Sequence, residues 1–145
     1  MRKFSQLITA VGAIATFAVA APAQAQYDEH LIAHVPFAFS VGTAALPSAT
    51  YDLTRMNGHR EMLVLRGDRG GIVMRVNDAG LPRGDREPSL VFHRYGDQYF
   101  LRQIQWVDTA RLDLPETKEE RKAAEAHIGR VAANMETVII AAGQR

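Results

Sequence analysis

The amino-acid sequence predicts a mainly β protein, a small antiparallel barrel or sandwich of about six or seven strands with one helix in its C-terminal half. Short apolar runs, several of them alternating with polar residues, are separated by turn residues at the spacing of about 8 to 12 residues that is typical of such folds. Asn57-Gly58 and Gly96-Asp97 lie between such runs as hairpin turns. One capped helix signal follows at Thr117. The pattern leaves the choice between barrel and sandwich open.

The N-terminus has the pattern of a secretory signal peptide over residues 1–25. Two basic residues precede an uncharged run from Phe4 to Ala21, and the small-residue site Ala23-Gln24-Ala25 predicts cleavage after Ala25. An uncleaved anchor is the alternative, although this alanine-rich run is weak for a permanent membrane span. We expect an exported bacterial protein, periplasmic or extracellular, with residues 26–145 as a single mainly β domain and no membrane span after cleavage.

Composition excludes several classes of function. The chain has no cysteine, which excludes disulfides, thiolate metal sites and cysteine nucleophiles. Without the two basic residues of the leader, 15 of the 17 Lys and Arg remain against 16 Asp and Glu, a formal net charge of −1. This balance provides no basic face, so we expect no nucleic-acid partner.

Period-two alternation predicts the first strand of the domain over residues 34–41. Pro36 lacks a backbone donor, so this strand should lie at an edge of the sheet or begin beside a bulge. Its apolar face is made of Val35, Phe37, Phe39 and Val41.

Three further strands are predicted in the first half of the domain. A turn at Leu46-Pro47-Ser48 leads into a strand from Thr50 to Met56, and its hairpin partner across Asn57-Gly58 is Arg60 to Arg66. The second of these strands carries a continuous apolar run, which predicts burial on both faces. A fourth strand covers Gly71 to Val76. The longest loop then follows, from Asn77 to Pro88.

The stretch from Ser89 to Val107 predicts a second hairpin, with strands over 89–94 and 98–107. Gly96-Asp97 fits a type II′ turn, which places Tyr95 opposite Gln98, Arg94 opposite Tyr99 and His93 opposite Phe100. This register allows the Arg94 guanidinium to stack on the Tyr99 ring. Neither face of the hairpin is purely polar, so we expect a central hairpin whose second face is partly covered by the helix or by a partner.

The helix is predicted from Lys118 to Ile128, where Thr117 as N-cap and Glu120 three residues later form a capping box. Most of its residues are charged, which indicates a helix lying on the surface of the sheet. The β-branched residues of Met135 to Ala142 favour a final strand, with a continuation of the helix as the alternative.

Few residues have the spacing of a catalytic or metal site. His93 is the one weak catalytic candidate, and the simpler interpretation is a half-buried strand histidine packed on Phe100. The other histidines of the domain stand singly, so we expect no metal and no cofactor. Serine elbows and phosphate-binding glycine loops are absent as well.

Three segments together resemble a family of small secreted bacterial proteins of uncharacterised function. VPFAFSVG with LPSATY, HRYGDQYFLRQIQW and LPETKEER are similar to motifs that recur in that family in this order, as VPFxFxVG, LPxGxY, HRYGDQYFLxxIW and LPxSxxER. Ala49 replaces the glycine of the second motif, and Thr117 replaces the serine of the fourth. The resemblance implies export and a shared small fold, and it brings no activity and no catalytic residues.

The leading hypothesis is an exported, non-catalytic binding module that contacts an envelope or extracellular protein or glycan. Aromatic and arginine side chains are effective interface anchors. The candidate binding residues are those at the exposed end of the hairpin and beside it, namely Arg94, Tyr95, Tyr99, Arg102 and Trp106.

Two further hypotheses stay open. A small exported hydrolase or lyase would use His93 as acid or base, and it requires a concave pocket around His93 and a second polar group within hydrogen-bond reach. A self-assembling structural component of the envelope would associate through an open strand edge near Pro36 or at the last strand.

Overall fold

We describe a computed structural model of the chain over residues 30–56, 59–80, 87–106, 111–128 and 135–144. The predicted signal peptide, the Asn57-Gly58 turn and half of the predicted long loop, residues 81–86, lie outside these residues. The described part contains eleven strands and one helix. In the first half the strands are β1 (His30–Val35), β2 (Phe39–Val41), β3 (Ala44–Leu46), β4 (Ala49–Met56), β5 (His59–Gly67) and β6 (Gly70–Arg75). The remaining elements are β7 (Asn77–Asp78), β8 (Ser89–Tyr95), β9 (Gln98–Gln105), β10 (Arg111–Asp113), α1 (Lys118–Ile128) and β11 (Glu136–Gln144).

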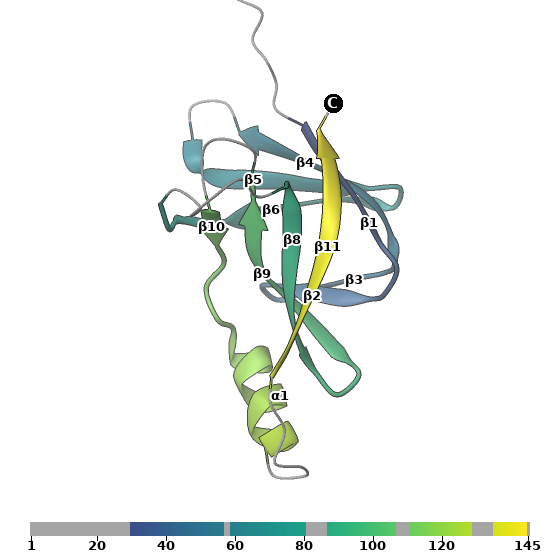
Figure 1. Ribbon diagram of the computed structural model, residues 1–145, viewed down its shortest axis with the longest axis vertical. Coiled ribbons are helices and arrows are strands. Elements are labelled where there is room, and N and C mark those ends of the chain that lie inside the picture. The colour runs from purple at the N-terminus through teal and green to yellow at the C-terminus, as the bar shows by residue number, and fades with distance from the viewer. Residues whose placement is uncertain (1–29, 57–58, 81–86, 107–110, 129–134, 145) are drawn as a thin grey trace, which may run out of the picture.

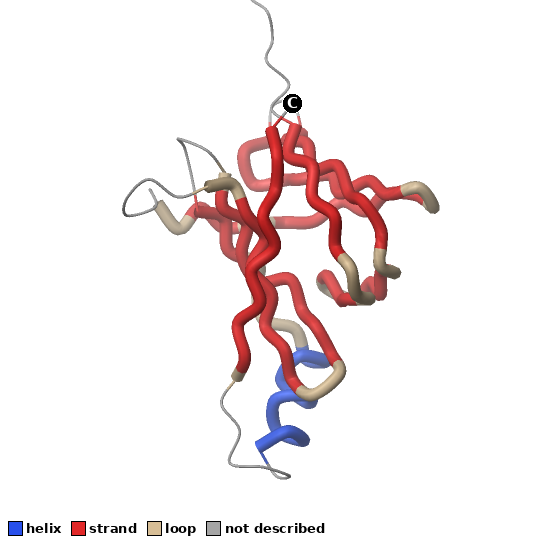
Figure 2. The backbone as a smooth tube through the Cα atoms, turned by 45° about the vertical axis from the view of Figure 1, so that its right-hand side comes forward, coloured by secondary structure: helices blue, strands red, loops and turns tan. Residues whose placement is uncertain are grey.

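The strands form one sheet that curls into a nearly closed barrel (Figures 1 and 2). Its order is β3-β2-β9-β8-β11-β1-β4-β5-β6, with β10 added beside β9 and β7 beside β10. All pairs are antiparallel except β2 with β9. The mainly β prediction is confirmed and the architecture is a barrel. The strand number exceeds the predicted one because β2, β3, β7 and β10 are only two or three residues long, too short to show a period.

The predicted first strand is divided at Pro36. β1 ends at Val35 and pairs on both sides, with β11 and β4, while β2 starts at Phe39 and pairs with β3 and β9. The prediction of an edge strand is therefore wrong. Proline cannot donate to a ladder, and here it marks the corner where the chain leaves one set of neighbours for another.

The remaining predicted strands are present, with one difference in burial. In the predicted apolar run of β5, Leu63 and Leu65 are buried while Met62 and Val64 are half-buried, so this run buries one face rather than two. In the predicted segment Met135–Ala142 the chain forms strand β11 from Glu136 rather than more helix, and β11 lies between β8 and β1. β11 pairs with β8 over Glu136–Ala141 and with β1 over Ala142–Gln144, and β1 pairs with β4 along its whole length, so both strands lie inside the sheet order.

The core lies inside the barrel and depends on a β-bulge in β9. Val91 pairs with Gln103 and Phe92 with Leu101, so one residue of β9, Arg102, has no direct partner in β8. A bulge of this kind reverses which alternate residues point inward. After it, Ile104 and Trp106 join Leu101 in the core.

Candidate functional site

The β8–β9 hairpin has the predicted register, and its turn has the glycine that the prediction required. Arg94 pairs with Tyr99 and His93 with Phe100. Gly96 has a φ of 62°, a left-handed value that favours glycine at the first turn position. The register places Arg94 and Tyr99 on the same face as the core residue Phe92, and it places His93 and Phe100 on the opposite face.

The predicted binding residues are consequently divided between two faces of the hairpin. Arg94 and Tyr99 lie on the inner face, and Tyr95 and Arg102 lie on the outer one, where α1 packs (Figure 1). Trp106 is in neither place, because it is 1% exposed in the core. The prediction that placed Trp106 beside the exposed end of the hairpin is therefore corrected: the indole is a core group and takes no part in the surface at the tip of the hairpin.

The Arg94 side chain contacts three neighbouring groups of the protein itself. Its guanidinium carbon lies 5.4 Å from the centre of the Tyr99 ring, as the stacking prediction required. Its Nε donates to the carbonyl oxygen of Gly96 at 2.8 Å, and its Nη1 donates to Oε2 of Glu136 at 3.0 Å. Tyr99 in turn stacks on Phe37, with ring centroids 3.9 Å apart. These contacts order the tip of the hairpin, and 36% of the Arg94 side chain remains exposed.

The outer face of the hairpin carries a buried charge cluster centred on Glu120. This carboxylate is 2% exposed although it belongs to a charged surface helix. Its Oε1 lies 3.2 Å from Nδ1 of His93, and its Oε2 accepts a hydrogen bond from Nη1 of Arg102 at 3.1 Å. Burial, together with the nearby carboxylates of Glu120 and Glu116, raises the pKa of Tyr95 above its ordinary value.

Glu120 also explains why only half of the predicted capping box forms. The backbone N–H of Glu120 donates to Oγ1 of Thr117 at 3.1 Å, so Thr117 is the N-cap. The carboxylate of Glu120 is directed to the sheet instead of back to the backbone of Thr117. Two of the segments quoted above, HRYGDQYFL and LPETKEER, therefore meet at this one side chain.

This cluster meets one of the two requirements of a catalytic histidine. Glu120 lies within hydrogen-bond reach of His93 and is placed to orient its ring. His93 is not among the residues that line the cavities beside β6, beside α1 or beside β3. The arrangement is most effective as an anchor, since it joins α1 to both strands of the hairpin through one buried carboxylate.

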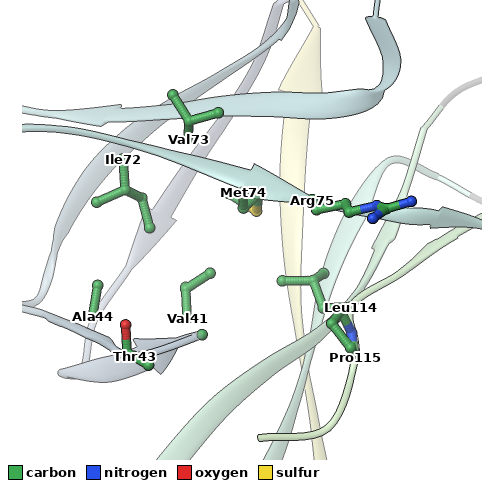
Figure 3. Close-up of a pocket in the computed structure, with 10 residues that line it drawn as sticks. Val41, Thr43, Ala44, Ile72, Val73, Met74, Arg75, Leu114 and Pro115 are labelled. Atoms are coloured by element: carbon green, nitrogen blue, oxygen red, sulfur yellow. The ribbon is translucent and has the colours of Figure 1, made fainter.

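A different part of the barrel presents an open surface. The sheet order ends at β3 on one side and at β6 on the other, and within the described residues each of these strands is paired along one edge only. Between the β2–β3 turn and β6 lies an apolar cavity of about 460 Å³ (Figure 3). Ile72 of β6 and Val41 of β2 point into it from opposite sides, and Leu114 lies at one end. We call this region the seam.

The seam continues past β3. A second cavity, of about 710 Å³, is lined by residues 45–51 and by residues 67–72 of the β5–β6 turn and β6. Ile72 lines both cavities. The two together follow the line along which the barrel does not close, and their volumes are in the range of ligand sites.

Comparison of the chain with protein-family models, with curated proteins and with solved structures finds no match. Within the described ranges, no three His, Asp or Glu side chains are grouped closely enough to hold a metal ion. No helix in the described part of the chain is long and apolar enough to cross a membrane.

Proposed function

We propose that this protein is an exported, non-catalytic binding module of the bacterial cell envelope or exterior, and that it binds an extended segment of a partner protein along the seam. The observation that carries the proposal is the pair of strand edges, β3 and β6, that face each other across an apolar cavity. Export rests on the leader pattern of residues 1–25.

An extended peptide is the ligand whose chemistry fits such a surface. In an edge strand every second residue directs its backbone N–H and C=O away from the sheet, where an added strand accepts and donates hydrogen bonds. Binding by strand addition takes its affinity from these backbone bonds and its specificity from pockets for alternate side chains. The seam provides both, with β6 as the edge and the two cavities as the pockets.

The side chains of β6 alternate as this mode requires. Ile72 and Met74 point toward the barrel interior and help to line the seam, and Met74 is 6% exposed. Val73 between them also borders the first cavity, but its side chain is 54% exposed and points away from that of Ile72 (Figure 3). The two directions supply a matched pair of variants: a charge at position 72 enters the seam, while the same charge at position 73 faces solvent.

The test is a selection of peptides on the protein isolated from its host. Random extended heptapeptides are selected for binding, and the affinity of each selected peptide is measured for the wild type, Ile72→Asp and Val73→Asp by titration calorimetry. We expect binding to weaken by at least about tenfold in Ile72→Asp and to change little in Val73→Asp. Amide hydrogen exchange should show new protection in β3 and β6 when peptide is bound. Protection elsewhere, or equal binding by both variants, would contradict the proposal.

The tip of the hairpin is a second contact that the same experiment tests. Arg94 and Tyr99 are largely engaged within the molecule, whereas Tyr95 is half-buried beside α1. The double variant Arg94→Ala/Tyr99→Ala separates the two surfaces. Loss of binding in this variant, with binding retained in Ile72→Asp, would move the site from the seam to the hairpin.

The hydrolase or lyase hypothesis keeps one observation in its favour, the 3.2 Å contact between Nδ1 of His93 and Glu120. It predicts turnover of an envelope polymer that is abolished in His93→Gln. The binding module predicts no turnover by either protein, measured as release of reducing ends or acyl groups from isolated envelope.

Self-assembly is also distinguishable. Among the described strands the main sheet order ends at β3 and β6, so we expect a structural component to associate through these two. Sedimentation of the wild type would then show concentration-dependent oligomers that disappear in Ile72→Asp.

A further inference from the structure

A second site lies inside the barrel, at the end of β4. Tyr51, Leu53 and Arg55 occupy alternate positions of this strand and so share one face. The first two are core residues, 3% and 0% exposed. Arg55 is therefore an arginine at a position where the pattern of the strand calls for an apolar side chain, and its guanidinium carbon lies 5.4 Å from the centre of the Trp106 ring.

The polar atoms of this pair are buried donors without acceptors. Nε and Nη2 of Arg55 and Nε1 of Trp106 are all shielded from solvent, and none has a hydrogen-bond partner among the described residues. Arginine keeps its charge at any ordinary pH, and neither guanidinium nor indole can accept a hydrogen bond. A buried charge without a partner is costly, so three such donors in one place require an explanation.

The two orphan atoms of Arg55 belong to the same edge of the guanidinium. Nε–H and one N–H of Nη2 are parallel, and together they form a fork that matches the two oxygens of a carboxylate. The indole N–H of Trp106 adds a third donor nearby. Arg55 as a whole is only half-buried, which leaves the rest of its side chain in reach of solvent.

We propose that Arg55 and Trp106 form a binding site for a carboxylate group, at the inner end of β4 and separate from the seam. The carboxylate would lie against the Nε and Nη2 edge of Arg55 and neutralise it, with Trp106 as an additional donor. The class of ligand is a small carboxylic acid or a molecule that presents one.

Trp106 makes the proposal directly measurable, because it is the only tryptophan in the chain. The protein isolated from its host is titrated with sodium acetate and with sodium succinate, at constant ionic strength maintained with sodium chloride, and the emission of Trp106 is recorded. We expect a saturable change with the carboxylates. Sodium phosphate is titrated in parallel.

Three variants separate the specific effect from a general one. Arg55→Gln removes the charge, Arg55→Lys keeps the charge but removes the fork, and Arg75→Gln removes an exposed arginine that pairs with Glu61. Carboxylate binding should weaken by about tenfold or more in Arg55→Gln and by several-fold in Arg55→Lys, with Arg75→Gln unchanged. Thermal unfolding of each variant checks that it is folded. If Arg55→Gln does not fold, the affinity of Arg55→Lys for the carboxylates decides the question.

Three outcomes would overturn the proposal. A change in emission that does not saturate is a bulk effect and excludes a site. Equal affinity in the wild type and Arg55→Lys would show that the fork plays no part. Saturable binding of phosphate without binding of acetate or succinate would exclude a carboxylate site.

Discussion

Two charged groups with buried atoms, Glu120 and Arg55, have opposite surroundings in the described part of the chain. Glu120 is 2% exposed and contacts both His93 and Arg102. The Nε and Nη2 atoms of Arg55 are also buried, yet within the described residues they have no partner. A buried charge with partners holds elements together, and here it fastens the only described helix to the sheet. A buried charge without partners weakens the fold and is useful only if something else neutralises it. Burial alone therefore does not show that a charged side chain stabilises the fold.

The largest effect should come from removing the paired charge. Glu120→Ala leaves Arg102 and His93 facing each other without a carboxylate and frees α1 from the hairpin. We expect a loss of about 3 kcal/mol in the free energy of unfolding, measured by urea denaturation. Glu120→Gln, which keeps the shape, should lose less. A loss below about 1 kcal/mol in Glu120→Ala would show that the cluster is not an anchor.

The unpaired charge should behave in the opposite way. Arg55→Met replaces the guanidinium by an apolar side chain of similar length, and we expect stability to be unchanged or to rise by about 1 kcal/mol. Arg102→Met is the matched control, and it should lose about 2 kcal/mol because it leaves Glu120 buried with only His93. The two variants are compared in one series of urea titrations. Equal losses in the free energy of unfolding would show that Arg55 and Arg102 contribute alike to stability.

The free energy of unfolding should depend on pH through Tyr95, which lies beside the Glu120 cluster. Burial and the neighbouring carboxylates raise the pKa of Tyr95 above 10.0, so the folded protein holds the phenol proton more tightly than the unfolded chain does. This contribution is complete below the unfolded pKa and is lost as the pH rises through the folded one. The free energy of unfolding should therefore fall above pH 10.0.

Tyr95→Phe tests this dependence. The fall should be shallower in the variant but should not vanish, because burial and Asp68 raise the pKa of Tyr51 in the same direction. Denaturation curves taken from about pH 9 to about pH 11 measure the slopes. Superimposable slopes for the wild type and the variant would mean that Tyr95 titrates alike in both states.

The smallest effect on stability should come from an exposed ion pair. Arg75 and Glu61 form an ion pair 3.0 Å apart, but their side chains are 72% and 62% exposed. Glu61→Gln should change the free energy of unfolding by less than about 0.5 kcal/mol, because water and salt screen such a pair. A loss of several times that size, measured in the same urea assay, would show that an exposed ion pair can stabilise this fold as much as the buried contacts of Glu120 do.

Local signals in the sequence predicted most of the elements. The cap at Thr117, the glycine at Gly96 and the β-branched run of β11 each act through near neighbours in the chain, and the structure has the helix, the hairpin register and the strand that they indicated. Strands of two or three residues carry no such signal. Nor does the break at Pro36, whose consequence depends on which strands lie beside β1 and β2.

The candidate sites depended on contacts between distant residues, and the sequence predicted them less well. The burial of Glu120 arises because His93 and Arg102 lie opposite it, and nothing near Glu120 in the chain indicates this. Trp106 is in the core because the bulge at Arg102 reverses the alternation of β9. The position of Arg55 could have been predicted from the sequence, because it continues the alternation of Tyr51 and Leu53. A charge at such a position indicates a candidate site.

The position of β11 between β8 and β1 has a consequence for the time course of folding. Leu31, at the start of the described chain, pairs with Gln144, at its end. Contacts between residues so far apart in sequence form late and slow the reaction, because a long loop must close first. Until β11 is made, β1 and β8 each present an unpaired edge along one side, and the barrel is an open sheet. Closure of the barrel on this side therefore waits for β11, and until then the edges of β1 and β8 are available to strands of other chains.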